Sequence, residues 1–211
     1  MIDAHSGIRR RNIPFQSRTP DMIPKKPKRP MTASALAVAM RSKNMVTRFT
    51  AVHAYRRGRP TADAVPALRK ALHDDEAGVV RCAAEALGKL GPAAGEAIDD
   101  LLAAATRMDD VTRTPQAYTE CIRALVKIQP DHWELPTVIK TFIGMDNWIP
   151  IRASLEALKA IGTPEAIDLL NRAAAFWMPE LNKMQRGVVE KILPTASDQR
   201  PRPKRRPASR A

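Results

Sequence analysis

The stretch AGVVRCAAEALGKLGPAAGEAIDDLL, which runs from Ala77 to Leu102, has a helical apolar pattern that stops at a glycine, Gly91. Apolar residues three and four positions apart line one face of an α-helix; here they are Val80, Ala83, Ala84 and Leu87. Glycine often follows the last turn of a helix. A second stretch, PIRASLEALKAIGTPEAIDLL from Pro150 to Leu170, repeats the pattern with different residues. The two copies indicate a chain built from helical repeats.

Three further segments share the register of Arg81–Leu87 (RCAAEAL) and Arg152–Leu158 (RASLEAL). They are Arg48–Ala54, Thr119–Leu125 and, more weakly, Arg186–Ile192, and the first residues of the five segments are 33, 38, 33 and 34 positions apart. Each segment follows another helical stretch: Ser34–Met40, Ala64–Leu72, Glu96–Ala105, Pro136–Phe142 and Thr163–Ala175. Proline stands at or near the start of three of these stretches, where a missing N–H costs little. We therefore predict an all-α protein, a right-handed α-solenoid of about five helical hairpins.

The composition agrees with this fold and limits the environment of the protein. Aromatic residues make up only 4% of the 211 residues, which suits close packing of helices better than a β-sandwich. Cys82 and Cys121 lie far apart in apolar helical segments and fit neither a disulfide framework nor a CxxC metal site. No apolar run reaches the length of a membrane span and no signal peptide opens the chain, so we expect a cytoplasmic protein. Basic tails could also target it to a nucleus or nucleoid.

Positive charge is concentrated at the two ends of the chain. Residues 1–30 carry eight Lys and Arg against two acidic residues, residues 194–211 carry six against one, and residues 31–193 carry 21 against 19. Both ends are rich in proline and poor in residues that could be buried. We therefore predict disordered basic arms at 1–30 and 194–211 and a folded body at 31–193. The arm residues expected to bind polyanions are Arg9, Arg10, Arg11, Lys25, Lys26, Lys28, Arg29, Arg202, Lys204, Arg205 and Arg206.

Two stretches carry a family resemblance. DDEAGVVRCAAEALGKLG (Asp74–Gly91) and MDNWIPIRASLEALKAIG (Met145–Gly162) each combine an Asp, a short turn, Val or Ile followed by Arg, an Ala/Leu pattern and Gly. This pattern resembles HEAT repeats, particularly the short subtype found in phycobilin lyases. The resemblance implies a scaffold whose second helices line a concave surface. It also implies a structural Asp–Arg ladder between neighbouring repeats, here involving Asp75 with Arg81 and Asp146 with Arg152.

The second helices would present a mixed, mildly basic stripe on that concave surface. Positions four and eight beyond the aligned Arg lie on one helix face. The residues of this stripe that we predict to bind a partner are Arg56, Glu85, Lys89, Arg123, Lys127 and Glu156. Because both signs of charge alternate along it, the stripe fits a protein partner better than a phosphate backbone.

Three tryptophans precede prolines and should lie near helix ends. Trp133, Trp148 and Trp177 would either fasten those ends or form a ridge of anchors for a partner. No histidine is followed by Glu and no phosphate-binding loop or nucleophile motif occurs, so we predict no metal, cofactor or catalytic site.

The leading hypothesis is a non-enzymatic adaptor that binds a protein partner on its concave face. The alternative is a nucleic-acid-associated protein that binds DNA or RNA through its arms. A third, enzymatic hypothesis is a lyase-like or glycosylase-like HEAT protein with a small-molecule cleft near Trp148 or Trp177.

Overall fold

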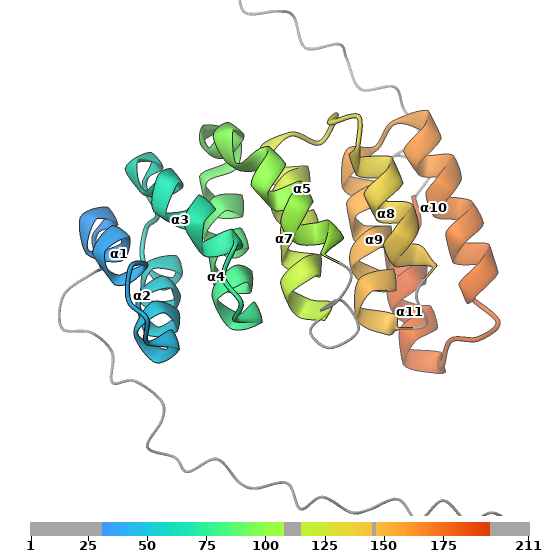
Figure 1. The fold of residues 1–211 in the computed structure, drawn as a ribbon. Helices are drawn as coiled ribbons and strands as arrows, with labels where there is room; N and C mark the ends of the chain where they lie inside the picture. Colours follow the sequence, from blue (N-terminus) through green and yellow to red (C-terminus); the bar gives the residue numbers. More distant parts are fainter. Residues whose placement is uncertain (1–30, 108–114, 145–146, 195–211) are drawn as a thin grey trace, which may run out of the picture.

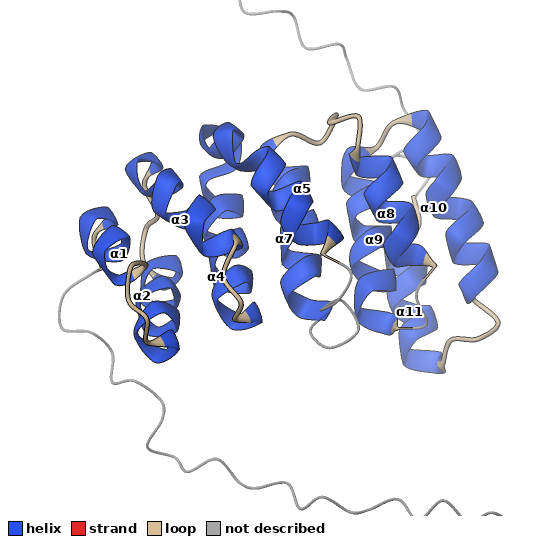
Figure 2. Cartoon of the chain, in the orientation of Figure 1, coloured by secondary structure: helices blue, strands red, loops and turns tan. Residues whose placement is uncertain are grey.

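The computed structural model describes residues 31–107, 115–144 and 147–194, which form a row of helical hairpins (Figure 1). The first helices of the five hairpins are α1 (Ala33–Ala39), α3 (Val65–Leu72), α5 (Ile98–Thr106), α8 (Leu135–Ile143) and α10 (Pro164–Trp177). The second helices are α2 (Met45–Arg57), α4 (Ala77–Leu90), α7 (Pro115–Ile128), α9 (Trp148–Ile161) and α11 (Lys183–Ile192). Short 3₁₀ segments, η2 (Ala62–Ala64) and η3 (Gly91–Ala97), precede α3 and α5. The described residues contain no strand (Figure 2).

The helix ends follow from local sequence. Five helices begin with a capping residue whose side-chain oxygen accepts a hydrogen bond from a backbone N–H group of the first turn. These residues are Thr32 for α1, Asn44 for α2, Asn147 for α9, Thr163 for α10 and Asn182 for α11. The prolines expected near helix starts fall in the first two positions of α3, α8 and α10. Gly91 and Gly162 end α4 and α9 with positive φ angles of 57° and 68°, which side chains disfavour.

The hairpins stack so that helices form two layers, one of first helices and one of second helices (Figure 1). Neighbouring second helices contact one another more extensively than neighbouring first helices do. The most extensive contact joins α4 to α7, where a Cβ atom placed on Gly88 would lie 3.2 Å from the Cα atom of Ala124. Because a stack curves toward its more closely packed side, we interpret the second-helix layer as the concave side.

A single apolar core runs between the two layers from one end of the stack to the other. Its largest fully buried side chains come from both layers: Leu36, Leu68, Leu72, Leu87, Leu101, Ile122, Leu125, Leu135, Ile139, Phe142, Leu155 and Leu158. This arrangement confirms the prediction of an all-α solenoid of five hairpins. Both predicted arms lie outside the described residues.

Candidate functional site

The second-helix face, the outer surface of α2, α4, α7, α9 and α11, is the candidate site. All six residues predicted to bind a partner lie on it, on the neighbouring helices α2, α4, α7 and α9. Most of them also hold neighbouring second helices together, as the ion pairs described next show.

The first group of ion pairs joins α2 to α4. The Arg56 guanidinium contacts the Glu85 carboxylate, and Lys89 Nζ lies 3.3 Å from the other oxygen of the same carboxylate. Lys89 also donates a hydrogen bond of 2.6 Å to the carbonyl oxygen of Arg56 near the end of α2. Burial alone would raise the pKa of Glu85, but the bonds from Lys89 and Arg56 hold it below its ordinary value.

The second group joins α7 to α9. Arg123 donates to Glu120 at 2.6 Å and to Glu156 at 3.1 Å, and Arg152 donates to Glu156 at 2.7 Å. Burial opposes the charge on Arg123, yet these hydrogen bonds keep its pKa above the ordinary value. Of the six predicted residues, Lys127 is exposed and has no ion pair within the described parts of the chain.

The second helices carry a strong excess of positive charge. Together they contain twelve Lys and Arg against four Glu, a formal net charge of +8, whereas the five first helices contain four basic and four acidic residues. The nearly balanced charge of the folded body therefore combines positive second helices, neutral first helices and an acidic excess in the segments that connect them. The predicted mixed stripe is one part of this layer and holds two of its four glutamates, Glu85 and Glu156.

The pKa of His53 on α2 is affected by this positive charge. Partial burial lowers the pKa of His53, and the charges of Arg56, Arg57 and Arg81 lower it further. The His53 ring stacks on Phe49 of the same helix with ring centres 5.5 Å apart.

In the first and fifth hairpins, the aligned Arg near the start of the second helix binds its own hairpin turn. Arg48 donates to the carbonyl oxygens of Ser42 and Lys43, and Arg186 donates to those of Leu181 and Pro179. The weakly matching Arg186 segment thus uses its Arg in the same way as the first hairpin.

Arg48 also extends to the next hairpin, where it binds Asp74 through two N–H···O bonds, one of 2.9 Å. Burial opposes the charge of Asp74, but the bond from Arg48 lowers its pKa below the ordinary value. One rung of the ladder expected from the resemblance is therefore present, with Asp74 and not the exposed Asp75 as its acidic residue, whereas Arg152 pairs with Glu156 of its own helix. Asp146 lies outside the described residues.

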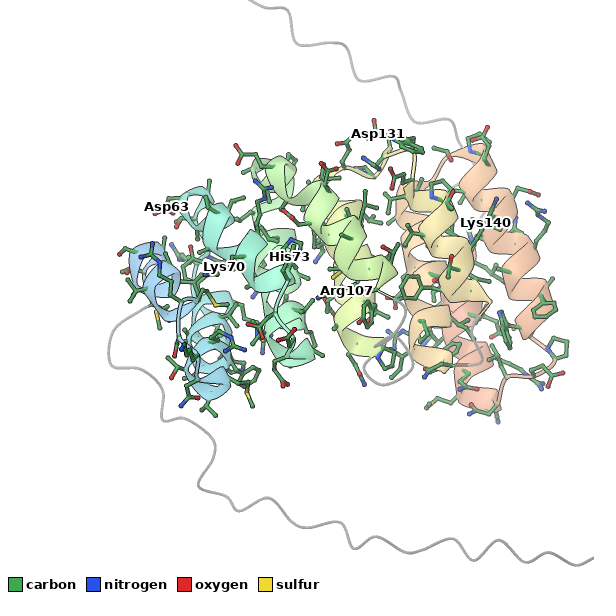
Figure 3. All side chains as sticks on the ribbon, in the orientation of Figure 1. Asp63, Lys70, His73, Arg107, Asp131 and Lys140 are labelled. Atoms are coloured by element: carbon green, nitrogen blue, oxygen red, sulfur yellow. The ribbon has the colours of Figure 1, made fainter. Side chains whose placement is uncertain are left out.

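The first-helix layer has its own contact between hairpins. Asp100 on α5 accepts hydrogen bonds from Arg69 of α3 and from His73, the residue that follows α3, the second at 2.7 Å. The Arg107 guanidinium donates a hydrogen bond of 2.7 Å to the carbonyl oxygen of Leu72, the last residue of α3, next to His73 (Figure 3). These contacts hold α3 and α5 together, so we assign them a structural role.

The three tryptophans have different settings. The Trp177 indole donates a hydrogen bond of 3.0 Å to the carbonyl oxygen of Ile143, which joins α10 to the end of α8. Trp148 packs half-buried against the core, whereas Trp133 is 79% exposed and stacks on His132. Two of the tryptophans thus fasten helix ends, and they do not form a continuous ridge with Trp133.

The described residues offer little for catalysis. No group of three or more potential metal ligands occurs among them. Burial raises the pKa of Cys82 and raises that of Cys121 to about 12, so neither thiol is a thiolate at neutral pH. Two open grooves, of about 330 and 480 Å³, lie beside Arg48 and Asp74 and between α8 and α10. No helix in the described regions is long and apolar enough to cross a membrane.

Comparison with known proteins identifies the repeat. The family described as HEAT repeats matches residues 32–118, from α1 to the start of α7, and the PBS lyase HEAT-like repeat matches residues 151–178 in α9 and α10. A search of curated proteins returns no match to the chain. Repeats of this kind generally serve as scaffolds for protein interactions. With five stacked hairpins and both repeat patterns in place, the chain belongs to the HEAT-repeat proteins, of the phycobilin-lyase-like subtype.

Proposed function

We propose that this protein is a non-enzymatic scaffold that binds a protein partner on the second-helix face. The observation that carries the proposal is the joining of five neighbouring helices into one surface with a net charge of +8. Ion pairs between α2 and α4 and between α7 and α9 hold parts of this surface in place before a partner binds. A surface that is ordered in advance loses less conformational entropy on binding. The protonated, buried thiols support a role without nucleophilic chemistry.

A steric experiment tests the location of the partner. Ala160 on α9 is exposed on the second-helix face, and Ala103 on α5 is exposed in the first-helix layer. We expect Ala160→Trp to abolish capture of the partner by the full-length protein, because the large ring blocks the face. Ala103→Trp is the matched control and should leave capture unchanged. Photo-crosslinkers placed at the same two positions should label the partner from position 160 only. Equal capture by both variants would rule out this face.

Association with nucleic acid through the arms is the second candidate function. The observation that favours it is the location of 14 of the 35 Lys and Arg residues in residues 1–30 and 194–211. Cations that neutralise phosphates release counterions, so affinity falls steeply with salt. Replacing the arm Lys and Arg by Gln in the full chain should flatten the salt dependence of binding to duplex DNA and structured RNA. An unchanged salt slope would exclude the arms as the binding segments.

A further inference from the structure

The last turns of the second helices form a row of cations, which we call the basic row. Every second helix has at least one Lys or Arg in its last turn: Arg57, Lys89, Lys127, Lys159 and Lys191. Second helices run in the same direction, so these residues lie along one edge of the second-helix face (Figure 1).

Compensation of the helix dipole explains only part of this row. Cations near a helix C-terminus are generally favourable. If that were the whole reason, first helices would show the same preference, yet α1, α5 and α10 have no basic residue in the last turn. The regularity of the second-helix layer therefore indicates an additional role for its cations.

Some members of the basic row already bind neighbouring helices, and others are exposed. Lys89 donates to the carbonyl oxygen of Arg56, and Lys159 donates to that of Lys191 at 3.3 Å. The side chains of Arg57, Lys127 and Lys191 are exposed and make no ion pair within the described residues. These three cations, which come from α2, α7 and α11, are available to an anionic partner along the length of the face.

Apolar side chains lie toward the opposite edge of the same face. Four of them are exposed in the first turns of second helices: Met45 (43%) and Val46 (49%) in α2, Ile149 (37%) in α9 and Met184 (73%) in α11. One edge of the second-helix face therefore carries these apolar side chains together with exposed cations such as Arg152 and Lys183, and the other edge, a helix length away, carries the basic row. A partner that fits both edges must itself be amphipathic.

The same features favour a polypeptide over a nucleic acid. Exposed large aromatic side chains, on which bases of single strands stack, lie outside the second helices at Trp133 and Phe176. Glu85 and Glu156 remain on the face between the cations and would repel a continuous phosphate backbone. Packed helices are about 8–10 Å apart, and residues seven apart in an α-helix are separated by about 10 Å. The three exposed cations come from alternate helices and are about 16–20 Å apart, so carboxylates spaced by two such heptads, about 20 Å, on a polypeptide can meet them and avoid the glutamates.

Building on the proposed function, we propose that the second-helix face binds an acidic amphipathic polypeptide segment. Its carboxylates contact the basic row, and its apolar side chains contact the exposed apolar residues at the starts of α2, α9 and α11.

Charge reversal at matched positions in the full-length protein tests this proposal. Lys127→Glu with Lys191→Glu removes cations from the basic row, and Lys70→Glu with Lys140→Glu is the control. All four lysines are exposed and lie in the last turns of their helices, so the two double variants change net charge and helix-end electrostatics equally. The probe is a fluorescein-labelled amphipathic helical peptide of about 28 residues, roughly 40 Å long, with Glu and Leu on opposite faces. Fluorescence anisotropy measures its dissociation constant at about 0.1 M salt, where charges more than about 10 Å apart are largely screened.

The expected result is binding at least about tenfold weaker for the basic-row variant and within about threefold of the parent for the control. Equal weakening of both variants would show a general charge effect and overturn the proposal, as would unchanged binding by both. Thermal unfolding of both variants verifies that they remain folded. An oligothymidylate probe that is bound more tightly than the peptide, and released by the basic-row variant alone, would assign the row to nucleic acid. If Ala160→Trp abolishes capture of the partner while the basic-row variant still binds the peptide, the scaffold function stands and the acidic chemistry of its partner is wrong.

Discussion

Ser154→Ala should stabilise the protein, although it removes a polar side chain from the middle of a second helix. Ser154 is 1% exposed in α9, and its Oγ atom has no hydrogen-bond partner in the described structure. Folding therefore takes this hydroxyl group out of water without replacing its hydrogen bonds. A buried polar group left unpaired in this way costs about 1–3 kcal/mol.

The size of the gain follows from three contributions. Removing the unpaired hydroxyl group recovers most of its desolvation cost, and Ala is better than Ser in a helix interior by about 0.5 kcal/mol. The lost oxygen leaves a small void that costs a few tenths of a kcal/mol, at about 24 cal/mol per Å³. The free energy of unfolding should rise by about 1–2 kcal/mol, which corresponds to roughly 3–6 °C in Tm for a chain of this size.

Urea denaturation followed by circular dichroism measures the change, and Thr119→Val is the matched control. Thr119 is equally buried in α7, but its hydroxyl group donates a hydrogen bond of 3.0 Å to the carbonyl oxygen of Gln116. Its removal should lower the free energy of unfolding by about 1 kcal/mol. A Ser154→Ala variant that is less stable than the parent by more than about 0.5 kcal/mol would refute the reasoning, because the hydroxyl group would then be stabilising.

Four further predictions concern packing, protonation, reactivity and helix ends. Gly88→Val should lower the free energy of unfolding by about 2–3 kcal/mol, measured by urea midpoint, because α4 and α7 have no room for a side chain there. The pKa of His53 is lowered in the folded state, so the unfolded chain takes up its proton first as the pH falls. The free energy of unfolding should therefore decrease as the pH drops below the unfolded pKa of about 6.5, and a His53→Gln variant should show a weaker dependence of Tm on pH in that range. Cys82 and Cys121 should react slowly with a disulfide reagent in the native protein and rapidly in urea, and fast native labelling of both would contradict their burial. Trp177→Phe should cost about 1 kcal/mol through loss of its indole hydrogen bond, and no change in Tm would show that this bond is unimportant.

The sequence predicted the fold well because each hairpin carries strong local signals. The predicted stretch Pro136–Phe142 corresponds to α8 at Leu135–Ile143, and Thr163–Ala175 corresponds to α10 at Pro164–Trp177. Proline starts, a glycine stop and the apolar period all act within a few residues. The start of α5 was less accurate, since Glu96 belongs to the 3₁₀ segment that precedes this helix.

The candidate site was only partly predictable, because its properties depend on contacts between repeats. The six predicted residues do lie on one face, but the pairing of Arg56 with Glu85 depends on which side chains of adjacent helices meet. The choice of Asp74 over Asp75 as the partner of Arg48 likewise depends on the conformation of the turn. The charge of the layer could have been found from the sequence by summing Lys, Arg, Asp and Glu over whole second helices, without limiting the count to two positions on each.

The ion pairs between second helices have a mechanical consequence. Arg56 with Glu85 and Arg123 with Glu156 each join adjacent hairpins, and each bond ends on a side chain that can rotate. Such bonds keep neighbouring helices together but tolerate small rotations between them, whereas a Cβ atom placed on Gly88 would lie only 3.2 Å from the Cα atom of Ala124, so α4 and α7 have little room to move against each other. Bending of the solenoid should therefore be smallest at the α4–α7 interface and larger at the α2–α4 and α7–α9 interfaces.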